Sequence, residues 1–406
     1  MKTVSFLFLA ILIWTSCQRN SESQQVFDFQ TETTPSGQAC VFPSLHATED
    51  GQLLMSWIHE EDTLSHLMVA SMKNGQWGKP LEVAQGSNWF VNWADFPNVS
   101  AMPDGRWFTF YLPVYDPETY GYNIAVRQSP NTGQSWSHPI ALYRDAPNTT
   151  QGFVSFFPTT DKTGAIWLEA LPMEGASAAH HDHDHDMVVR YAAIDADGKL
   201  SDEQVLDDYV CTCCQTDAVA IPGGAIAVYR DRSKDEIRDI SYVRLQNGQW
   251  SAPKTLHEDN WQINACPVNG PAIDAFGNTV AVAWYSMSDA EGKVWLSFSQ
   301  NAGETFDPPV RIDLGKPLGR VDVLMLDAES ALVSWVEKAE GSGSLNIKLV
   351  QKDGAIIASQ QVSPFEPVRP TGFPRMAKVG DKVFIAWTEG AAEDARDGQG
   401  DRQRAR

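Results

Sequence analysis

The sequence predicts an all-β protein built as a β-propeller, a ring of four-stranded blades, and two observations lead to this prediction. First, one unit recurs along the chain: Phe-Pro or a related pair, an alternating apolar run, a Gly turn, and an apolar strand that ends in an aromatic residue. Second, another pair of alternating segments with its own turn lies between successive units. Period-two alternation and turn residues predict β-hairpins, and repeats about 50 to 60 residues apart are typical of propeller blades.

The first hairpin of each repeat is predicted in seven places. These are residues 42–57, 96–111, 157–168, 214–229, 266–284, 320–335 and 373–387. A second hairpin follows six of them, as in residues 66–83, 124–142 and 240–256. We therefore expect seven blades, with residues 26–31 (VFDFQT) closing the seventh as its outer strand. The last repeat lacks a clear third strand, and a six-bladed ring is the alternative.

The two ends of the chain are predicted to lie outside the propeller, which covers residues 26–390. The apolar run of residues 4–14 follows Lys2 and is too short for a membrane-spanning helix of about 20 residues, so residues 1–16 are predicted to be a secretory signal peptide. The polar residues 17–25 are predicted to be a flexible tether. Residues 391–406 contain no apolar side chain larger than Ala and are predicted to be a disordered tail.

The signal peptide resembles that of bacterial lipoproteins, because small residues lead directly to Cys17. This resemblance implies an acylated Cys17 and an exported domain, anchored by lipid to the bacterial cell envelope, with the outer membrane as the expected location. A plain secretory signal is the alternative, since Trp14 stands where lipoprotein signals usually carry Leu.

The charge of the chain limits its partners. A formal net charge of −21 argues against nucleic acid and anionic lipid surfaces as partners, because phosphate binding needs a basic patch. Apart from the lipid anchor we expect no contact with the membrane. We expect a monomer whose partner is a metal ion, another small ligand or a glycan.

Two turns carry a family signature. SPNTGQSW at residues 129–136 and SQNAGETF at residues 299–306 resemble the Asp-box (BNR repeat), Ser-x-Asp-x-Gly-x-x-Trp, of sialidase-like propellers. Both have Asn in place of Asp, at Asn131 and Asn301, and Phe306 replaces Trp. The resemblance covers the whole mature chain and implies a fold rather than an activity, because the box closes a turn and packs an aromatic ring between strands.

The unusual residues gather at one predicted face of the ring. In a propeller, the start of each innermost strand and the loop between its second and third strands open on the same face, around the channel. Apart from Cys17, the cysteines all fall at the entries of innermost strands: Cys40, Cys211, Cys213, Cys214 and Cys266. A histidine cluster, HHDHDHD, falls in the corresponding loop of blade three, and its imidazoles are His180, His181, His183 and His185. Blades three to five are neighbours, so these groups are expected to converge.

Three interpretations of the cysteines remain open. An oxidising exported compartment favours disulfides, although an odd number leaves at least one thiol over. Closely spaced thiolates with imidazoles suit copper or zinc, which predicts a metal site drawn from Cys211, Cys213, Cys214, Cys266 and the four histidines. In the third interpretation the thiols are inert and the histidine segment is a solvated loop.

Charged residues near the channel supply candidate catalytic groups. Arg230 and Asp231 open the second-to-third strand loop of blade four, and Arg320 and Arg375 begin the first hairpins of blades six and seven. Guanidinium groups suit a substrate carboxylate, although a solvated, salt-bridged loop is the commoner arrangement. In sialidases an Arg-Ile-Pro motif at the first hairpin grips the carboxylate; here Val41 stands in the Arg position, which makes sialic acid a poor substrate.

Three functions follow from these features. The first is an exported propeller that binds copper, zinc or a small ligand at the Cys/His face of blades three to five. The second is a sialidase-related glycoside hydrolase or lyase that acts on glycans. The third is a protein-interaction scaffold stabilised by disulfides.

Overall fold

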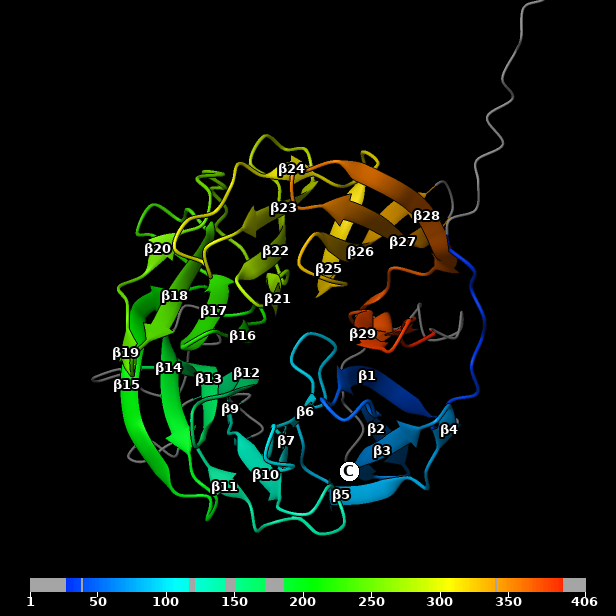
Figure 1. Ribbon diagram of the computed structural model, residues 1–406. Coiled ribbons are helices and arrows are strands. Elements are labelled where there is room, and N and C mark those ends of the chain that lie inside the picture. The colour runs from blue at the N-terminus through cyan, green and yellow to red at the C-terminus, as the bar shows by residue number, and fades with distance from the viewer. Residues whose placement is uncertain are drawn as a thin grey trace, which may run out of the picture. The chain divides into compact units, whose positions relative to one another are not determined.

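The computed structural model describes residues 27–37, 39–116, 121–142, 150–171, 186–339 and 342–389. It divides into two units, Met1–Thr31 and Glu32–Arg406. Residues 32–389 of the second unit, within the described ranges, form an all-β ring of radially arranged sheets (Figure 1). In the described part of the chain, no helix is both long enough and apolar enough to cross a membrane.

Six sheets of four or five antiparallel strands are complete blades. Blades one and two contain β1 (Cys40–Ala47), β2 (Leu53–Glu61), β3 (Leu64–Lys73), β4 (Gln76–Trp77) and β5 (Leu81–Gly86), then β6 (Val99–Ala101), β7 (Trp107–Tyr111), β10 (Ala125–Ser129) and β11 (Ile140–Ala141). Blades three and four contain β12 (Gln151–Pro158), β13 (Thr163–Ala170), β14 (Met187–Ile194) and β15 (Leu200–Val210), then β16 (Asp217–Ile221), β17 (Gly224–Arg230), β18 (Ile240–Gln246), β19 (Gln249–Trp250) and β20 (Lys254–Thr255). Blades five and six contain β21 (Ala272–Phe276), β22 (Thr279–Ser286), β23 (Lys293–Ser299) and β24 (Val310–Arg311), then β25 (Pro317–Met325), β26 (Ser330–Ala339), β27 (Ser342–Gln351) and β28 (Ile356–Phe365).

Three small elements complete the described structure. A two-stranded sheet of β8 (Val114–Asp116) and β9 (Gly121–Tyr122) extends from blade two. The single-turn helix η1 (Arg369–Thr371) leads into the last hairpin, β29 (Arg375–Val379) and β30 (Lys382–Ala386). Strand β29 packs between β25 and β1, so this hairpin closes the ring of innermost strands.

The propeller and its four-stranded blades are confirmed, and each predicted first hairpin forms. The number of complete blades matches the six-bladed alternative; the preferred count of seven is not confirmed, because β29–β30 has only two described strands. The predicted closing strand at residues 26–31 is wrong for residues 27–31, which form no strand. The rings of Phe27 and Phe29 stack on each other. The alternating apolar residues of this segment therefore serve a local ring contact.

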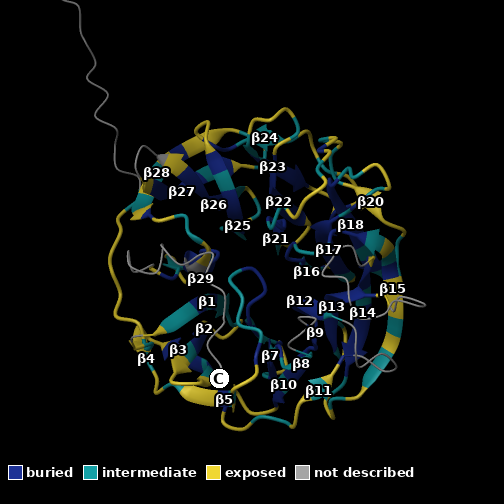
Figure 2. Cartoon of the chain, turned by 180° about the vertical axis from the view of Figure 1, so that it is seen from behind, coloured by how far each residue is buried: buried dark blue, intermediate teal, exposed yellow. Residues whose placement is uncertain are grey.

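The hydrophobic core lies between blades and explains the aromatic residue of each repeat. Trp167, Trp284 and Trp335 occupy the second strands of three blades and are fully buried. Exposed residues concentrate on outer strands such as β5 and β15, while second strands such as β13 and β22 are buried along their whole length (Figure 2). Burial of such side chains, each worth about 1.5–3 kcal/mol, holds neighbouring blades together.

Asparagine performs the role of aspartate in both Asp-box turns. In the second turn the Ser299 hydroxyl donates to Asn301 Oδ1 (2.8 Å) and accepts from the Gly303 N–H (2.9 Å), while Asn301 Oδ1 also accepts from the Thr305 N–H (3.0 Å). The first turn makes the equivalent bonds around Asn131. A carbonyl oxygen is all that the turn requires, so the Asn substitution preserves it.

Replacing Gly303 by Ala is expected to destabilise the propeller. Gly303 has φ +75°, and an added Cβ lies 2.3 Å from Ile226 Cδ1 on the preceding blade. Left-handed backbone strain and overpacking together predict a loss of about 2 kcal/mol or more in the free energy of unfolding, measured by chemical denaturation. Gly277→Ala is the matched control: φ is +60° but no atom lies within 4 Å, so only the backbone cost of about 1 kcal/mol is expected. Equal losses in the two variants would contradict the packing role of the turn.

Candidate functional site

The turn between β15 and β16 gathers three thiols. Cys211 follows β15 directly, and its N–H donates to the Arg230 carbonyl at the end of β17 (3.1 Å), which ties the turn to its own blade. Cys211 Sγ then lies 3.9 Å from Cys213 Sγ and 3.6 Å from Cys214 Sγ. The three sulfur atoms are all within 4.8 Å of one another. We call Cys211, Cys213 and Cys214 the thiol cluster.

Blade five brings a fourth sulfur to this cluster. Cys266 lies in the segment before β21, is exposed, and has its Sγ 3.8 Å from Thr212 Oγ1. It also accepts a hydrogen bond from the Cys213 thiol, and this bond lowers the pKa of Cys266 to about 6. The predicted convergence of the cysteines of blades four and five is therefore observed. None of the cysteines among the described residues is in a disulfide.

Positive charge surrounds the thiol cluster on its buried side. Arg238 donates from Nη1 to Cys211 Sγ at 3.3 Å and is itself held by Glu236 (Nη2 to Oε2, 2.7 Å). Hydrogen bonding with Cys213 and Cys214, and then the nearby guanidinium groups of Arg238 and Arg230, lower the pKa of Cys211 well below its usual value. Cys211 is thus prepared to carry a thiolate.

Arg230 and Asp231, two of the candidate catalytic residues, serve the structure of this loop. Arg230 is fully buried, donates to the carbonyls of Asn269, Arg238 and Tyr285, and stacks over Trp261. The Asp231 carboxylate accepts from Ser241 Oγ at 2.8 Å, and burial raises its pKa to about 6. The Arg230 guanidinium is committed to backbone oxygens of blades four and five.

Arg320 is also committed to the fold. It is buried and donates to Thr371 Oγ1 (2.7 Å) and to the carbonyls of Gly372 and Val368, and burial lowers its pKa to about 10. Its guanidinium lies 4.9 Å from the ring centre of Trp93. Arg320 therefore fixes the segment that leads into β29.

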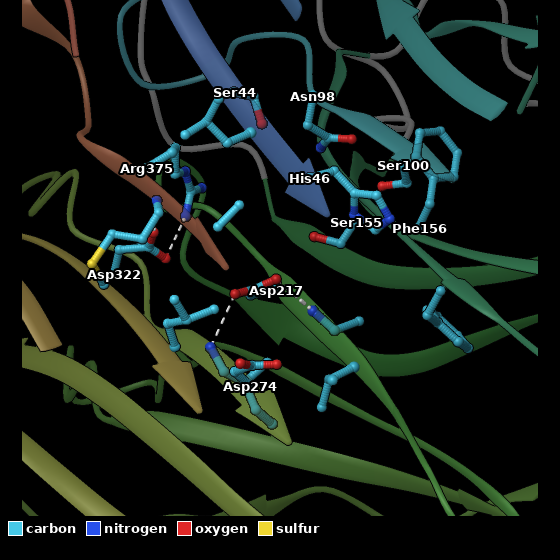
Figure 3. Close-up of a pocket in the computed structure, with 18 of the residues that line it drawn as sticks. Ser44, His46, Asn98, Ser100, Ser155, Phe156, Asp217, Asp274, Asp322 and Arg375 are labelled. Carbon is cyan, nitrogen blue, oxygen red and sulfur yellow. Dashed lines mark hydrogen bonds and ion pairs between the residues drawn. The ribbon is translucent and has the colours of Figure 1, made fainter. Parts of the chain in front are cut away.

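Arg375 is the one candidate arginine that lines the central cavity. The cavity has a volume of about 610 Å³ and is bordered by all seven innermost strands, from β1 to β29. Arg375 Nη1 pairs with Asp322 Oδ1 at 3.3 Å, with Asp217 and Asp274 nearby (Figure 3). Aromatic rings pack beside the cavity: Phe96 lines it, and Phe373 stacks on Phe96 and on Trp93.

The channel aspartates, which the sequence analysis missed, join blades four, five and six each to the innermost strand that follows. The Asp217 carboxylate accepts from the Ile273 N–H (2.9 Å), and Asp274 accepts from the Met325 N–H (2.6 Å). Asp322 accepts from Met376 in the same way (2.7 Å). The available signal was a recurring Asp in the first strand of a hairpin, where period-two alternation predicts apolar residues.

The remaining predicted site residues, which are four histidine ligands and the acylated Cys17, lie outside the described residues. His180, His181, His183 and His185 belong to residues 172–185, and Cys17 belongs to residues 1–26. Cys40, by contrast, is described and lies on blade one.

The fold and the site define a β-propeller in which loops of two neighbouring blades gather four cysteines. Residues 51–355 match the BNR repeat-like domain family. The chain belongs to this BNR repeat-like family, which confirms the sialidase-like Asp-box resemblance.

Solved structures with a TM-score of 0.50 are similar to this fold at low sequence identity. A protein of unknown function from Dyadobacter fermentans has a TM-score of 0.50 at 15% identity, covering 76% of this chain and 94% of its own. An ulvan lyase of polysaccharide lyase family 25, bound to a glucuronate–sulfated rhamnose saccharide, has a TM-score of 0.50 at 10% identity, covering 79% and 81%. A Hadza microbial sialidase has a TM-score of 0.46 at 14% identity, covering 73% and 63%. No protein of curated function matches the chain.

The channel carboxyls predict a specific dependence of stability on pH. Burial raises the pKa of Asp274 to about 7, so the folded state favours the protonated carboxyl. The stability that this protonated carboxyl contributes is complete below about pH 4 and is lost as the pH rises through 7. Relative to the parent, Asp274→Asn is expected to gain about 2 kcal/mol in unfolding free energy between pH 5 and pH 8. A constant offset from altered hydrogen bonding cancels in this difference.

The matched control is Asp327→Asn. Asp327 accepts from the Glu329 N–H, which lowers its pKa. The Asp327 carboxylate of the parent is therefore ionised in both the folded and the unfolded state between pH 5 and pH 8. Its difference from the parent is expected to be flat over this range in urea unfolding. If the difference in unfolding free energy between Asp274→Asn and the parent does not change with pH, Asp274 does not retain its proton in the folded state.

Proposed function

We propose that this protein binds a soft metal ion, copper(I) or zinc, at the thiol cluster, with Cys266 as a fourth ligand. The separations between the sulfur atoms carry the proposal. Thiolates at 2.3 Å from a tetrahedral zinc ion are about 3.8 Å apart, and the cluster has separations of 3.6 and 3.9 Å. The thiols therefore need little rearrangement to enclose an ion.

The chemistry of the ligands favours a soft ion. Thiolate ligands select copper(I) and zinc over hard cations such as magnesium or calcium. Binding requires deprotonated sulfur, and the guanidinium of Arg238 at 3.3 Å from Cys211 Sγ favours that charge. The Arg230 guanidinium stiffens the same loop by donating to backbone carbonyls. A stiffer loop loses less conformational entropy when it binds a metal ion.

Exposure of the fourth ligand bears on how the ion is used. Cys211 and Cys214 are buried, whereas Cys266 is exposed and comes from the neighbouring blade. A site closed on three sides, with one accessible thiol, suits uptake and transfer of an ion. We infer a role in metal handling rather than purely structural zinc binding.

We extend the proposal to location. Residues 1–16 and Cys17 support an exported lipoprotein of the bacterial cell envelope, and an extracytoplasmic propeller meets metal ions before they reach the cytoplasm. The proposal rests on the sequence pattern of these residues.

A glycan-processing enzyme is the second candidate. Its support is the propeller shared with the ulvan lyase and the polar cavity that contains Arg375. Against it stand the commitment of Arg230 and Arg320 to protein oxygens and the presence of Val41 in place of the sialidase arginine. The metal proposal has the more specific geometry.

Replacing Cys213 and Cys214 together by Ser is expected to remove one tightly bound equivalent of copper(I) or zinc from the reduced protein. The reason is that a single remaining buried thiolate and the exposed Cys266 cannot enclose the ion. Metal content is measured by mass spectrometry of protein purified without chelator, with a competing chelator setting the affinity. Cys266→Ser is expected to keep the equivalent but weaken it at least tenfold.

Thr212→Ala is the control in the same turn, because it removes a side chain between the ligands without removing a thiol. It is expected to retain the metal. Unchanged metal content in a folded Cys213→Ser/Cys214→Ser protein would refute the proposed site.

A further inference from the structure

A second group of metal-binding side chains crosses one edge of blade one. Cys40 on β1 pairs directly with His59 on β2, and His59 pairs directly with His66 on β3. Directly opposed residues of antiparallel strands project from the same face of a sheet, with Cβ atoms about 4.5–5.5 Å apart. The three side chains therefore form one row, which we call the blade-one row.

The contacts within the blade-one row are close. Cys40 Sγ lies 3.6 Å from His59 Nδ1. The rings of His59 and His66 have centroids 5.8 Å apart. His66 Nδ1 lies 2.8 Å from Glu82 Oε2 on β5, and the His66 side chain is only 12% exposed. Four strands of one sheet thus contribute to a continuous polar row.

One atom of this row has no protein partner. His66 Nε2 is buried without a hydrogen bond among the described residues. When Nδ1–H donates its hydrogen bond to the Glu82 carboxylate, the neutral imidazole carries its free lone pair on Nε2. A buried, unpaired acceptor costs about 1–3 kcal/mol, so its presence calls for a ligand.

The same arrangement is how proteins prepare a histidine for a metal. A ligating imidazole usually donates its other N–H to a carboxylate or carbonyl, which fixes the tautomer and raises the basicity of the ligating nitrogen. Glu82 supplies this carboxylate to His66. Glu82 is half exposed, so its carboxylate is able to follow a movement of the ring.

The distances fit a shared ion. Sulfur at 2.3 Å and nitrogen at 2.0–2.1 Å from a tetrahedral zinc lie about 3.6 Å apart, which is the separation of Cys40 Sγ and His59 Nδ1. Two imidazoles on one tetrahedral ion have centroids about 5.2 Å apart, and the observed 5.8 Å means that the rings have to approach each other by about 0.6 Å.

One adjustment is needed to close the site. Within the described residues, only the thiol cluster has three ligand atoms within 4.8 Å of one another. The His66 ring therefore has to turn toward His59, a movement about χ2, whose energy well is broad for histidine.

We propose that Cys40, His59 and His66 form a second metal site, separate from the thiol cluster, that takes a zinc-type divalent ion with Glu82 as the carboxylate behind His66. One thiolate and two imidazoles make it a harder site than the thiol cluster, so it prefers divalent zinc or cobalt to copper(I). It goes beyond the proposed function and stands independently of it, since the two sites share no residue.

Cobalt(II) is the probe, because a cobalt–thiolate bond gives a near-ultraviolet charge-transfer band that distinguishes Cys ligation. Titration is done on the full chain with Cys211, Cys213 and Cys214 replaced by Ser, which removes the first site. We expect one equivalent of cobalt with the thiolate band, displaced by zinc. Cys40→Ser is expected to lose the band, and His59→Ala/His66→Ala to lose binding.

Two further variants separate ligation from folding. Glu82→Gln is expected to keep the stoichiometry and weaken affinity 10- to 100-fold, as loss of a supporting carboxylate does. His138→Ala, an exposed histidine elsewhere, is expected to change nothing. If the triple Ser chain does not fold, the parent is used, and bound divalent ions are expected to fall by one equivalent in His59→Ala/His66→Ala.

Two results would overturn the proposal. One is absence of cobalt binding by the folded triple Ser chain. The other is cobalt binding that survives in a folded His59→Ala/His66→Ala variant. If only the proposal for the thiol cluster is wrong, the parent chain binds no more metal than the triple Ser chain, and the blade-one row still binds cobalt.

Discussion

The ring depends on how each blade is joined to the next, and buried carboxylates make several of these joints. Asp217, Asp274 and Asp322 each accept a backbone N–H from the following innermost strand. An innermost strand hydrogen-bonds on only one side within its own blade, so its remaining N–H groups need acceptors in the channel wall. The aspartates satisfy this need at the cost of desolvating charge, which raises the pKa of Asp274 to about 7.

This way of joining blades separates the scaffold from the chemistry. With the channel carboxylates and Arg375 paired, reactive groups are left to the loops that precede innermost strands. At blade four the loop turns within four residues and is held by Arg230, so the Cys211, Cys213 and Cys214 thiols face one another. Blade five adds Cys266, whose Sγ lies 3.8 Å from Thr212 Oγ1 in the blade-four loop.

The sequence predicts the hairpins well because alternation and turn glycines are local signals, and it predicts the meeting of the cysteines because propeller topology is regular. It does not predict the fate of Arg230 or Arg320, since backbone carbonyls that accept from them come from residues about 8 to 55 positions away. Nor does it predict the pairing of Cys40 with His59, because strand register decides which side chains are opposite. The alternation of residues 27–31 resembles a strand, but a strand also needs a paired edge, which local pattern cannot supply.

X-ray absorption spectroscopy of the metal-loaded protein, with the blade-one row removed by His59→Ala/His66→Ala, tests the central claim most directly. The account predicts a first shell of three or four sulfur atoms, at about 2.3 Å for zinc. A shell dominated by nitrogen or oxygen would contradict the thiol cluster as the metal site.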